Sequence, residues 1–375
     1  MAIDNKDKKV LNVPHLRFPE FTEEWNSKSL IDLANVIGGG TPDTTVKSYW
    51  DGEIQWFTPS EIGKSKYVDL SIRTITEEGL NNSSAKLLPS GTILLSTRAT
   101  IGECSLSLRK CATNQGFQSL VSKKCNTDFL YYLIQTKKKD LIRKSCGSTF
   151  LEISANEVRK IQVSVPTEVE QQRIAELLSL IDERIATQNK IIEKLQSLIK
   201  GLAAQLTQSG TPNIRLCDCL ECHSSTLQEN CVSVTGSYPV YGATGLIGYT
   251  NNYAYNGESI LIVKDGSGVG SLSYVNDHFS VIGTLNYLTA KENYSILYLY
   301  YALMAFNFTP YITGMAIPHI YFKDYGKAKL FYPSIEKRIR IASLLHNIDQ
   351  KLVAEQNLVI SLSAQKSYLL RMLFI

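Results

Sequence analysis

The sequence predicts an α+β protein with two globular units and two long helices packed as an antiparallel coiled coil of pseudo-twofold symmetry. Three observations support this fold class: a duplication at fixed spacing, an apolar heptad stripe in each copy, and strand-like and helix-like segments elsewhere. The chain of 375 residues is long enough for more than one core. Its 44% hydrophobic and 20% charged residues are ordinary for a globular protein.

The duplication is clearest around two prolines. "VSVPTEVEQQRIAELLSLIDERIATQ" from Val163 resembles "LFYPSIEKRIRIASLLHNIDQKLVAEQ" from Leu330, with Pro166 aligned to Pro333. We call the separation of these two prolines the repeat offset, and Gly147 and Gly314 keep it upstream. Because a fixed period marks repeated structural units, we expect globular units at 1–165 and 210–332, followed by helical spacers at 166–209 and 333–375.

Both spacers carry an apolar stripe with alternating steps of four and three residues, which predicts coiled-coil helices over about 168–207 and 335–374. A proline just before each helix suits a helix start. At 1.5 Å per residue each helix would span roughly 60 Å. The stripe comprises Ile174, Leu178, Ile181, Ile185, Ile192, Leu195, Ile199, Leu202 and Leu206 in the first helix, and Ile341, Leu345, Ile348, Leu352, Val359, Leu362, Leu369 and Leu373 in the second.

Polar residues interrupt the stripe at Gln188 in the first helix and at Glu355 and Lys366 in the second. Gln188 and Glu355 lie near the two helix midpoints, which meet if the helices pair antiparallel. A polar pair in an apolar seam fixes register at some cost in stability, so we assign these two residues a register role. A globular unit at each end would suit a twofold reader of duplex DNA, whereas the alternative is a hairpin for oligomerisation only.

The globular units mix strand and helix signals. "GTILLST" and "SILIVK" are strand-like runs, and "DFLYYLIQTKK" and "SILYLYYALMAF" are amphipathic segments whose aromatic residues we assign to the core. The glycine-rich "DGSGVG" from Asp265 follows a strand. Its backbone N–H groups suit a phosphate, although a simple tight turn is the plainer interpretation.

Charge and cysteine content point to an intracellular protein. The formal net charge is only +4, and the local basic run "KKKDLIRK" at 137–144 suits either a polyanion or a solvated helix end. The polar start "MAIDNKDKKVLNV" has no signal-peptide pattern, and no window approaches the roughly 20 apolar residues of a membrane span. We therefore expect a soluble, cytoplasmic protein with reduced cysteines. "CDCLECH" at 217–223 lacks the separated pairs of a zinc ribbon, so we expect unpaired thiols and no metal.

The common catalytic patterns are missing. "GKS" at 63–65 lacks the glycine of a phosphate loop, because Thr58 stands in its place. Asp43 and Glu53 suggest a magnesium nuclease, but Gln55 occupies the position of its usual lysine. The chain has no Pro-Pro-aromatic motif for base methylation, and five scattered histidines suggest no triad. These observations predict a non-catalytic binding protein.

Several segments together resemble a known family. They are "VPHLRFPEFTEEW", "GGGTPDTTVKSYWDGEIQWFTPSEI", "GTILLSTRATIG", "TNQGFQSL" and the duplicated "EQQRIAELLSLID" helix. In this order they resemble the specificity subunit of type I restriction–modification enzymes over nearly the whole chain. The second unit departs at its start, where "NCVSVTGSYPVYGATGLIGYTNNY" replaces the glycine-rich pattern.

The resemblance implies two target-recognition domains that each read half of a bipartite DNA sequence, with helical spacers that set the gap. It also implies assembly with two methyltransferase subunits and with restriction (translocase and nuclease) subunits. S-adenosylmethionine and ATP with magnesium would belong to those partners, and this chain would hold no cofactor. The rival interpretations are a coiled-coil scaffold that does not read DNA, and a solitary nuclease.

Candidate DNA contacts are polar and basic side chains in turn-rich segments at matching places in the two units. In the first unit they are Thr41, Ser60, Lys64, Arg98, Thr100, Gln115, Ser148 and Thr149; in the second they are Tyr241, Thr244, Lys264, Ser267, His319 and Lys323.

Overall fold

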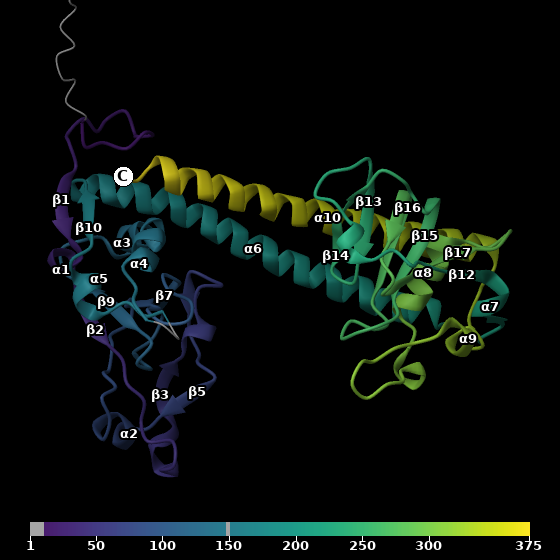
Figure 1. Cartoon of the computed structure of the whole chain (residues 1–375), viewed down its shortest axis with the longest axis horizontal. Helices are drawn as coiled ribbons and strands as arrows, with labels where there is room; N and C mark the ends of the chain where they lie inside the picture. The colour runs from purple at the N-terminus through teal and green to yellow at the C-terminus, as the bar shows by residue number, and fades with distance from the viewer. Residues whose placement is uncertain (1–10, 148–150) are drawn as a thin grey trace, which may run out of the picture. The chain divides into compact units, whose positions relative to one another are not determined.

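The computed structural model describes residues 11–147 and 151–375 and divides into two compact units. Unit 1 comprises Met1–Asn189 with Leu358–Ile375, and unit 2 comprises Lys190–Asn357. The division cuts two long helices, α6 (Glu168–Thr207) and α10 (Ile335–Met372), so each unit contains part of both (Figure 1).

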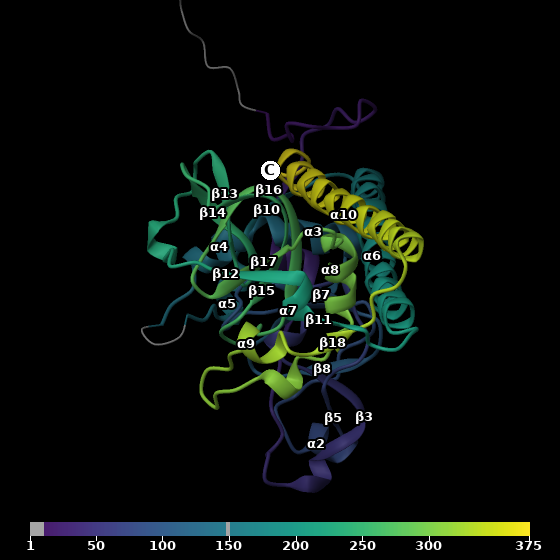
Figure 2. The same cartoon turned by 90° about the vertical axis from the view of Figure 1, so that its right-hand side faces the viewer.

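The two long helices occupy the segments that the heptad stripe predicts. In unit 1, Ile174 and Leu178 near the start of α6 share a core with Leu369 and Leu373 near the end of α10. In unit 2 the opposite halves of α6 and α10 share a separate core. Each unit thus joins the early part of one helix to the late part of the other, which is the predicted antiparallel pairing (Figures 1 and 2).

The two register residues are both buried. Gln188 is 8% exposed, and its Oε1 finds no hydrogen-bond partner among the described residues. Glu355 is 7% exposed and pairs with Lys351 of its own helix at 2.5 Å. Their role in register therefore stays a prediction.

In unit 1, a pair of strands joins the segment just before α6 to the early part of the chain. β1 (Asn26–Ser29) pairs antiparallel with β10 (Gln162–Val165), and the short helix α1 (Leu30–Leu33) follows β1. Arg17 adds a second tie, because its Nε and Nη2 each lie 2.8 Å from the buried carboxylate of Glu170 in α6. The resembling segment "VPHLRFPEFTEEW" is therefore anchored to the first spacer helix.

A five-stranded sheet and a three-stranded sheet form the body of unit 1. The first has the order β2-β9-β6-β7-β4, and the second has β5-β3-β8. Trp50 and Trp56 pack edge to face in the smaller sheet, with ring centroids 5.1 Å apart. The strands are β2 (Ala34–Gly38), β3 (Trp50–Phe57), β4 (Tyr67–Val68), β5 (Arg73–Ile75), β6 (Ile93–Leu95), β7 (Cys104–Ser107), β8 (Cys111–Thr113) and β9 (Gln118–Ser122); the helices are η1 (Lys47–Tyr49), η2 (Pro59–Glu61), α2 (Glu77–Asn81), α3 (Thr127–Thr136), α4 (Lys138–Arg143) and α5 (Ala155–Arg159).

Unit 2 repeats the plan with one larger sheet. β11 (Ile214–Arg215) pairs antiparallel with β18 (Lys329–Leu330), as β1 does with β10. The main sheet has the order β12-β17-β15-β16-β13-β14. Its strands are β12 (Leu220–Ser224), β13 (Tyr238–Gly242), β14 (Gly245–Thr250), β15 (Tyr255–Val263), β16 (Leu272–Val281) and β17 (Leu285–Ala290); the helices are α7 (Leu216–Cys219), η3 (Glu229–Cys231), α8 (Ile296–Met304), η4 (Thr309–Tyr311) and α9 (Phe322–Tyr325).

The aromatic segments form the predicted core helices α3 and α8. Tyr132 and Tyr301, like their neighbours on these helices, are buried. Asn126 and Ser295 cap the two helices by accepting a hydrogen bond from the backbone three residues on, which is a usual helix start.

The cysteine-rich segment forms ordinary secondary structure. "CDCLECH" provides most of α7 and the start of β12, and its cysteines are free thiols. Burial raises the pKa of Cys219 to about 12. In the described part of the chain, no group of three or more His, Cys, Asp and Glu side chains is placed to hold a metal ion. None of the helices described there is long and apolar enough to cross a membrane.

Candidate nucleic-acid interface

A pair of hydrogen-bonded loops projects from each unit at equivalent positions. In unit 1, the loop after β6 bonds to the segment before α5, where Ile153 N donates to Thr97 O at 3.1 Å. In unit 2, the loop after β15 does the same, and Ile320 N donates to Lys264 O at 2.9 Å. Both donors and both acceptors are separated by the repeat offset, so the duplication is preserved at the level of single hydrogen bonds.

The bridges in the two loop pairs also correspond one to one. Glu152 bridges to both Arg98 and Cys146 in unit 1. In unit 2 His319 bridges to both Asp265 and Thr313. Each residue of the second set follows its counterpart by the repeat offset. The loop pair is therefore one framework that carries different side chains in the two units.

The tip of the loop pair in unit 1 has an unusual backbone. Ala99 has a φ of 62°, in the left-handed region that non-glycine residues rarely adopt. Ala99 follows Arg98, whose carbonyl oxygen accepts hydrogen bonds from Thr100 N at 2.8 Å and from Ser96 Oγ at 2.9 Å. Strained backbone of this kind persists where the surroundings hold it, and it concentrates at binding sites.

A hollow of about 340 Å³ adjoins Arg98. We call it the Arg98 hollow; it is lined by Pro59, Ser60, Arg98, Ala99, Asn114, Gln115 and Gly116. Thr41 borders it, because its Oγ1 donates to Gln115 Oε1 at 2.5 Å.

Two local features hold the lining of the Arg98 hollow in place. The turn that carries Ser60 is fixed by a capping box, in which Glu61 Oε2 accepts from Thr58 N at 2.8 Å and from Thr58 Oγ1 at 2.6 Å. A Cβ on Gly116 would lie 3.1 Å from both Pro59 Cγ and Asn114 Oδ1, so glycine allows the closest packing here.

The structure brings together four of the predicted contact residues of unit 1 at the Arg98 hollow: Thr41, Ser60, Arg98 and Gln115. Thr100 lies in the adjoining turn, and its Oγ1 donates to Ser96 Oγ at 3.2 Å. Lys64 belongs to a different hollow. Ser148 and Thr149 fall outside the described residues.

In unit 2 the predicted residues divide between two places. Lys264, Ser267 and His319 lie on the loop pair, and Lys323 follows on α9 with its Nζ 5.1 Å from the Tyr321 ring centroid. Tyr241 and Thr244 belong instead to the β13–β14 hairpin.

Sequence reasoning missed Glu152 and Asp265 as members of the loop pairs. The signal was present, because the repeat offset aligns Glu152 with His319 and Arg98 with Asp265. Asn114 was also missed, although it precedes Gln115.

The nuclease residues form no comparable site. Asp43 Oδ1 accepts from Thr45 N at 2.9 Å and from Thr45 Oγ1 at 2.7 Å, and these hydrogen bonds lower the pKa of the Asp43 carboxyl. This is the pattern of an Asx turn. Glu53 lies on β3.

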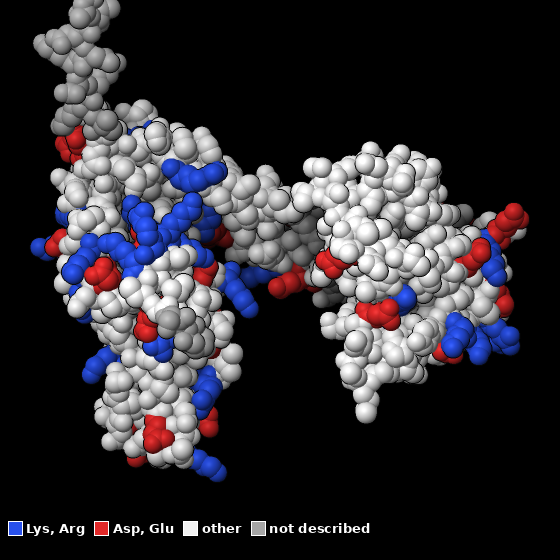
Figure 3. All heavy atoms as spheres, viewed as in Figure 1, with Lys and Arg blue, Asp and Glu red and all other residues white. Residues whose placement is uncertain are grey.

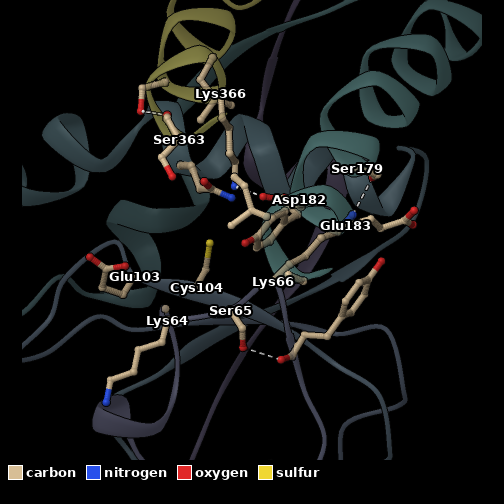
Figure 4. A pocket seen from close by; sticks show the side chains of 18 of the residues that line it. Lys64, Ser65, Lys66, Glu103, Cys104, Ser179, Asp182, Glu183, Ser363 and Lys366 are labelled. Carbon is tan, nitrogen blue, oxygen red and sulfur yellow. Dashed lines mark hydrogen bonds and ion pairs between the residues drawn. The ribbon is translucent and has the colours of Figure 1, made fainter. Parts of the chain in front are cut away.

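The second hollow of unit 1 has a volume of about 550 Å³ and lies where the body of the unit meets α6 and α10 (Figure 4). Two of its lysines are paired with carboxylates. Lys66, which is 9% exposed, lies 2.6 Å from Asp128 Oδ1 and donates to Ser179 Oγ at 2.7 Å. Lys366 Nζ lies 2.6 Å from Asp182 Oδ1, whereas Lys64 points away from both (Figure 4). The polar contacts in this hollow therefore serve mainly to pack the body of unit 1 against α6 and α10.

Lysine and arginine side chains gather on one face of unit 1, over α3, α4 and α5 (Figure 3). The run "KKKDLIRK" begins at Lys137, directly after α3, and includes all of α4; Lys138, Lys139 and Arg143 are exposed. The same view of unit 2 shows fewer charged side chains. Exposed basic groups of this density attract a polyanion such as the DNA backbone.

Two similar units with equivalent loop pairs, carried on antiparallel helices, define a duplicated recognition protein. The profile described as "Type I restriction modification DNA specificity domain" matches residues 22–197 and again residues 214–362. The chain therefore belongs to this family, whose members provide specificity rather than catalysis.

The curated relatives carry corresponding names. The chain is 38% identical over 181 residues to the type I restriction enzyme MjaIX specificity subunit of Methanocaldococcus jannaschii, a match that covers 46% of this chain and only 42% of the relative. It is 25% identical over 359 residues to the EcoprrI specificity subunit of Escherichia coli, with 87% of each chain covered.

Solved structures show the same fold. The S subunit of a type I restriction–modification system from M. genitalium has a TM-score of 0.65 at 18% identity, covering 97% of this chain and 99% of that one. A chain from a structural study of complex assembly in a type I restriction–modification system has a TM-score of 0.54 at 16% identity, covering 92% and 96%.

Proposed function

We propose that this chain is the DNA-recognition subunit of a type I restriction–modification complex. Each unit reads one half of a bipartite duplex sequence through its loop pair, and α6 and α10 set the spacing between the halves. The observation that carries the proposal is the loop pair itself, which keeps a matched backbone hydrogen bond and matched bridges in both units but carries different side chains. Such an arrangement suits two recognition units that bind DNA in the same way but recognise different sequences.

The partners follow from the same proposal. The helices would dock two methyltransferase subunits, and the complete complex would add restriction subunits. S-adenosylmethionine, ATP and magnesium would bind in those partners, and the complex would act in the cytoplasm. In support, the matched relatives are named as specificity subunits of restriction enzymes.

Methylation mapping tests the proposal. The chain is expressed in cells together with a methyltransferase subunit of a type I system, and methylated bases are located by sequencing. We expect methylation at one asymmetric sequence interrupted by a gap of fixed length. Methylation without a bipartite sequence would contradict the proposal.

A gel-shift experiment separates the rival functions. The full chain, with and without the methyltransferase subunit, is mixed with duplex DNA, and we expect retardation that weakens as salt rises. A scaffold that does not read DNA would gather the methyltransferase without adding sequence preference. Magnesium-dependent cleavage by the chain alone would favour the nuclease.

A further inference from the structure

The loop pairs of the two units carry opposite charges at one matched position. Arg98 in unit 1 corresponds to Asp265 in unit 2, and Glu152 corresponds to His319. A strong hydrogen-bond donor in one unit is therefore replaced by an acceptor in the other. If both loop pairs read DNA, as proposed above, this position distinguishes bases with opposite hydrogen-bonding edges.

Glu152 holds the Arg98 guanidinium by one edge. Its Oε2 accepts from Arg98 Nε at 3.1 Å and from Nη2 at 2.5 Å. The Nη1 atom forms no hydrogen bond with any described residue, so the end-on edge of Nη1 and Nη2 retains free donors. The Arg98 side chain is 42% exposed. An arginine held in this way is pre-oriented for a second, bidentate partner.

The Arg98 hollow adds further donors. Asn114 Oδ1 is occupied by Gly116 N at 2.9 Å, and Gln115 Oε1 is occupied by Thr41 Oγ1 at 2.5 Å. The NH₂ groups of both amides donate to no described residue, so they remain available as donors. Guanine presents two acceptors, N7 and O6, in the major groove, and bidentate arginine is its commonest partner.

The matched position in unit 2 has the opposite preference. The Asp265 carboxylate, with a side chain 38% exposed, can only accept hydrogen bonds while it is ionised. Lys264 Nζ lies 3.4 Å from its Oδ2. In the major groove, a carboxylate finds its donor in the exocyclic amino group of cytosine or adenine.

We infer that Arg98 reads a guanine in the half-site of unit 1, and that Asp265 reads an amino-bearing base at the matched position of the other half-site. Glu152 acts as a positioning residue, since it orients Arg98. This inference rests on the proposed function and specifies it, because it names one base class for each half-site.

The experiment compares single variants of the full chain by methylation mapping with the methyltransferase subunit. Arg98→Ala should relax the requirement for one guanine, by roughly 5- to 150-fold in discrimination, in one half-site only. Asp265→Ala should relax one cytosine or adenine in the other half-site only. Glu152→Gln, which keeps the shape but removes the charge, should weaken the same guanine preference less than Arg98→Ala does.

Arg109→Ala is the matched control. Arg109 is also an exposed arginine of unit 1 paired with a carboxylate, since its Nη2 lies 3.1 Å from Asp69 Oδ2, but it does not line the Arg98 hollow. The recognised sequence should be unchanged in this variant. Arg98→Lys tests whether misfolding explains the effect of Arg98→Ala. It keeps the positive charge and a long side chain but not the bidentate geometry, so this variant should fold and should still lose the guanine preference.

The outcomes separate this inference from the proposed function. If the unaltered chain directs methylation to no bipartite sequence, the proposed function fails. If it does so, but Arg98→Ala and Arg98→Lys keep every guanine requirement, only the inference is overturned. It is also overturned if Arg98→Ala weakens all duplexes equally with a smaller salt dependence, because that result identifies a phosphate contact.

Discussion

Lys366 Nζ of α10 lies 2.6 Å from Asp182 Oδ1 of α6, joining two helices that are far apart in the sequence within unit 1. Tyr132 of α3 donates to the other oxygen of Asp182 at 2.7 Å, so both long helices and the body of the unit meet at one carboxylate. The residue that the repeat offset aligns with Lys366 is Ile199, which is buried in the core of unit 2. The ion pair is therefore specific to one copy of the repeat.

Replacing Lys366 with alanine should destabilise unit 1. Lys366 and Asp182 have side chains only 18% and 14% exposed, and removing one partner leaves the other charge poorly solvated. We expect a loss of about 3 kcal/mol in the free energy of unfolding, measured by denaturant titration. In the double variant with Asp182→Asn, the loss of unfolding free energy should be smaller than the sum of the losses in the two single variants. Additive losses would show that the pair does not couple the helices.

The Lys366–Asp182 pair also shows which parts of the structure could be predicted from the sequence and which could not. The heptad stripe identified Lys366 as a polar interruption and placed both helices to within a few residues, because periodicity is local information. It did not identify Asp182 as the partner, since the rotation of one helix against another depends on packing across the whole unit.

The sheets and the site show the same limit. β3 pairs in parallel with β8, and β13 with β16, and such non-local pairings leave no signature in a short stretch of sequence. Likewise the sequence selected Arg98 by residue type. Glu152 reaches Arg98 only through the loop pair, so the orientation of the guanidinium followed from the structure.

Gln188 and Glu355 provide a test of helix register. Both are buried in the stripe, and Gln188 Oε1 has no hydrogen-bond partner among the described residues. Replacing both with leucine should leave the chain folded but allow more than one register, because a polar residue in a seam acts against alternatives. Crosslinking between cysteines placed beside the Asp182–Lys366 contact reports the register. A single crosslinking pattern, unchanged from the parent chain, would remove the register role.

Gly38 and Gly39, just before Thr41 in the sequence, allow a comparison of substitutions at two adjacent residues. A Cβ on Gly39 would lie 2.0 Å from Asn114 O, in the segment that carries Gln115, whereas one on Gly38 meets only the flexible Gln118 side chain at 3.6 Å. Gly39→Ala should therefore shift the lining of the hollow, cost about 1–3 kcal/mol in stability and weaken DNA binding. Gly38→Ala is the control and should change little. The measurements are thermal unfolding and gel shift, and equal effects of the two substitutions would contradict the assignment.

Asp349, the counterpart of Asp182, should make the stability of unit 2 depend on pH. Burial raises its pKa above the ordinary value of 3.8, while Tyr301, whose hydroxyl donates to it at 3.4 Å, and nearby His346 act in the opposite direction. As pH rises from 3.8 through the raised folded-state pKa, the unfolded chain loses this proton first. The folded state holds more protons in that window, so the free energy of unfolding falls as pH rises.

Asp349→Asn removes this ionisation while it retains an oxygen that can accept from Tyr301. We expect the variant to be more stable than the parent chain at neutral pH, and the difference to vanish as the pH falls towards 3.8. Denaturant titrations across the acidic to neutral range measure the difference. Asp277→Asn is the control with the opposite sign, because hydrogen bonds from His278 lower the pKa of Asp277, so that variant should gain nothing at neutral pH. A stability gain for Asp349→Asn that is the same at every pH would show that side-chain packing, rather than ionisation, is responsible.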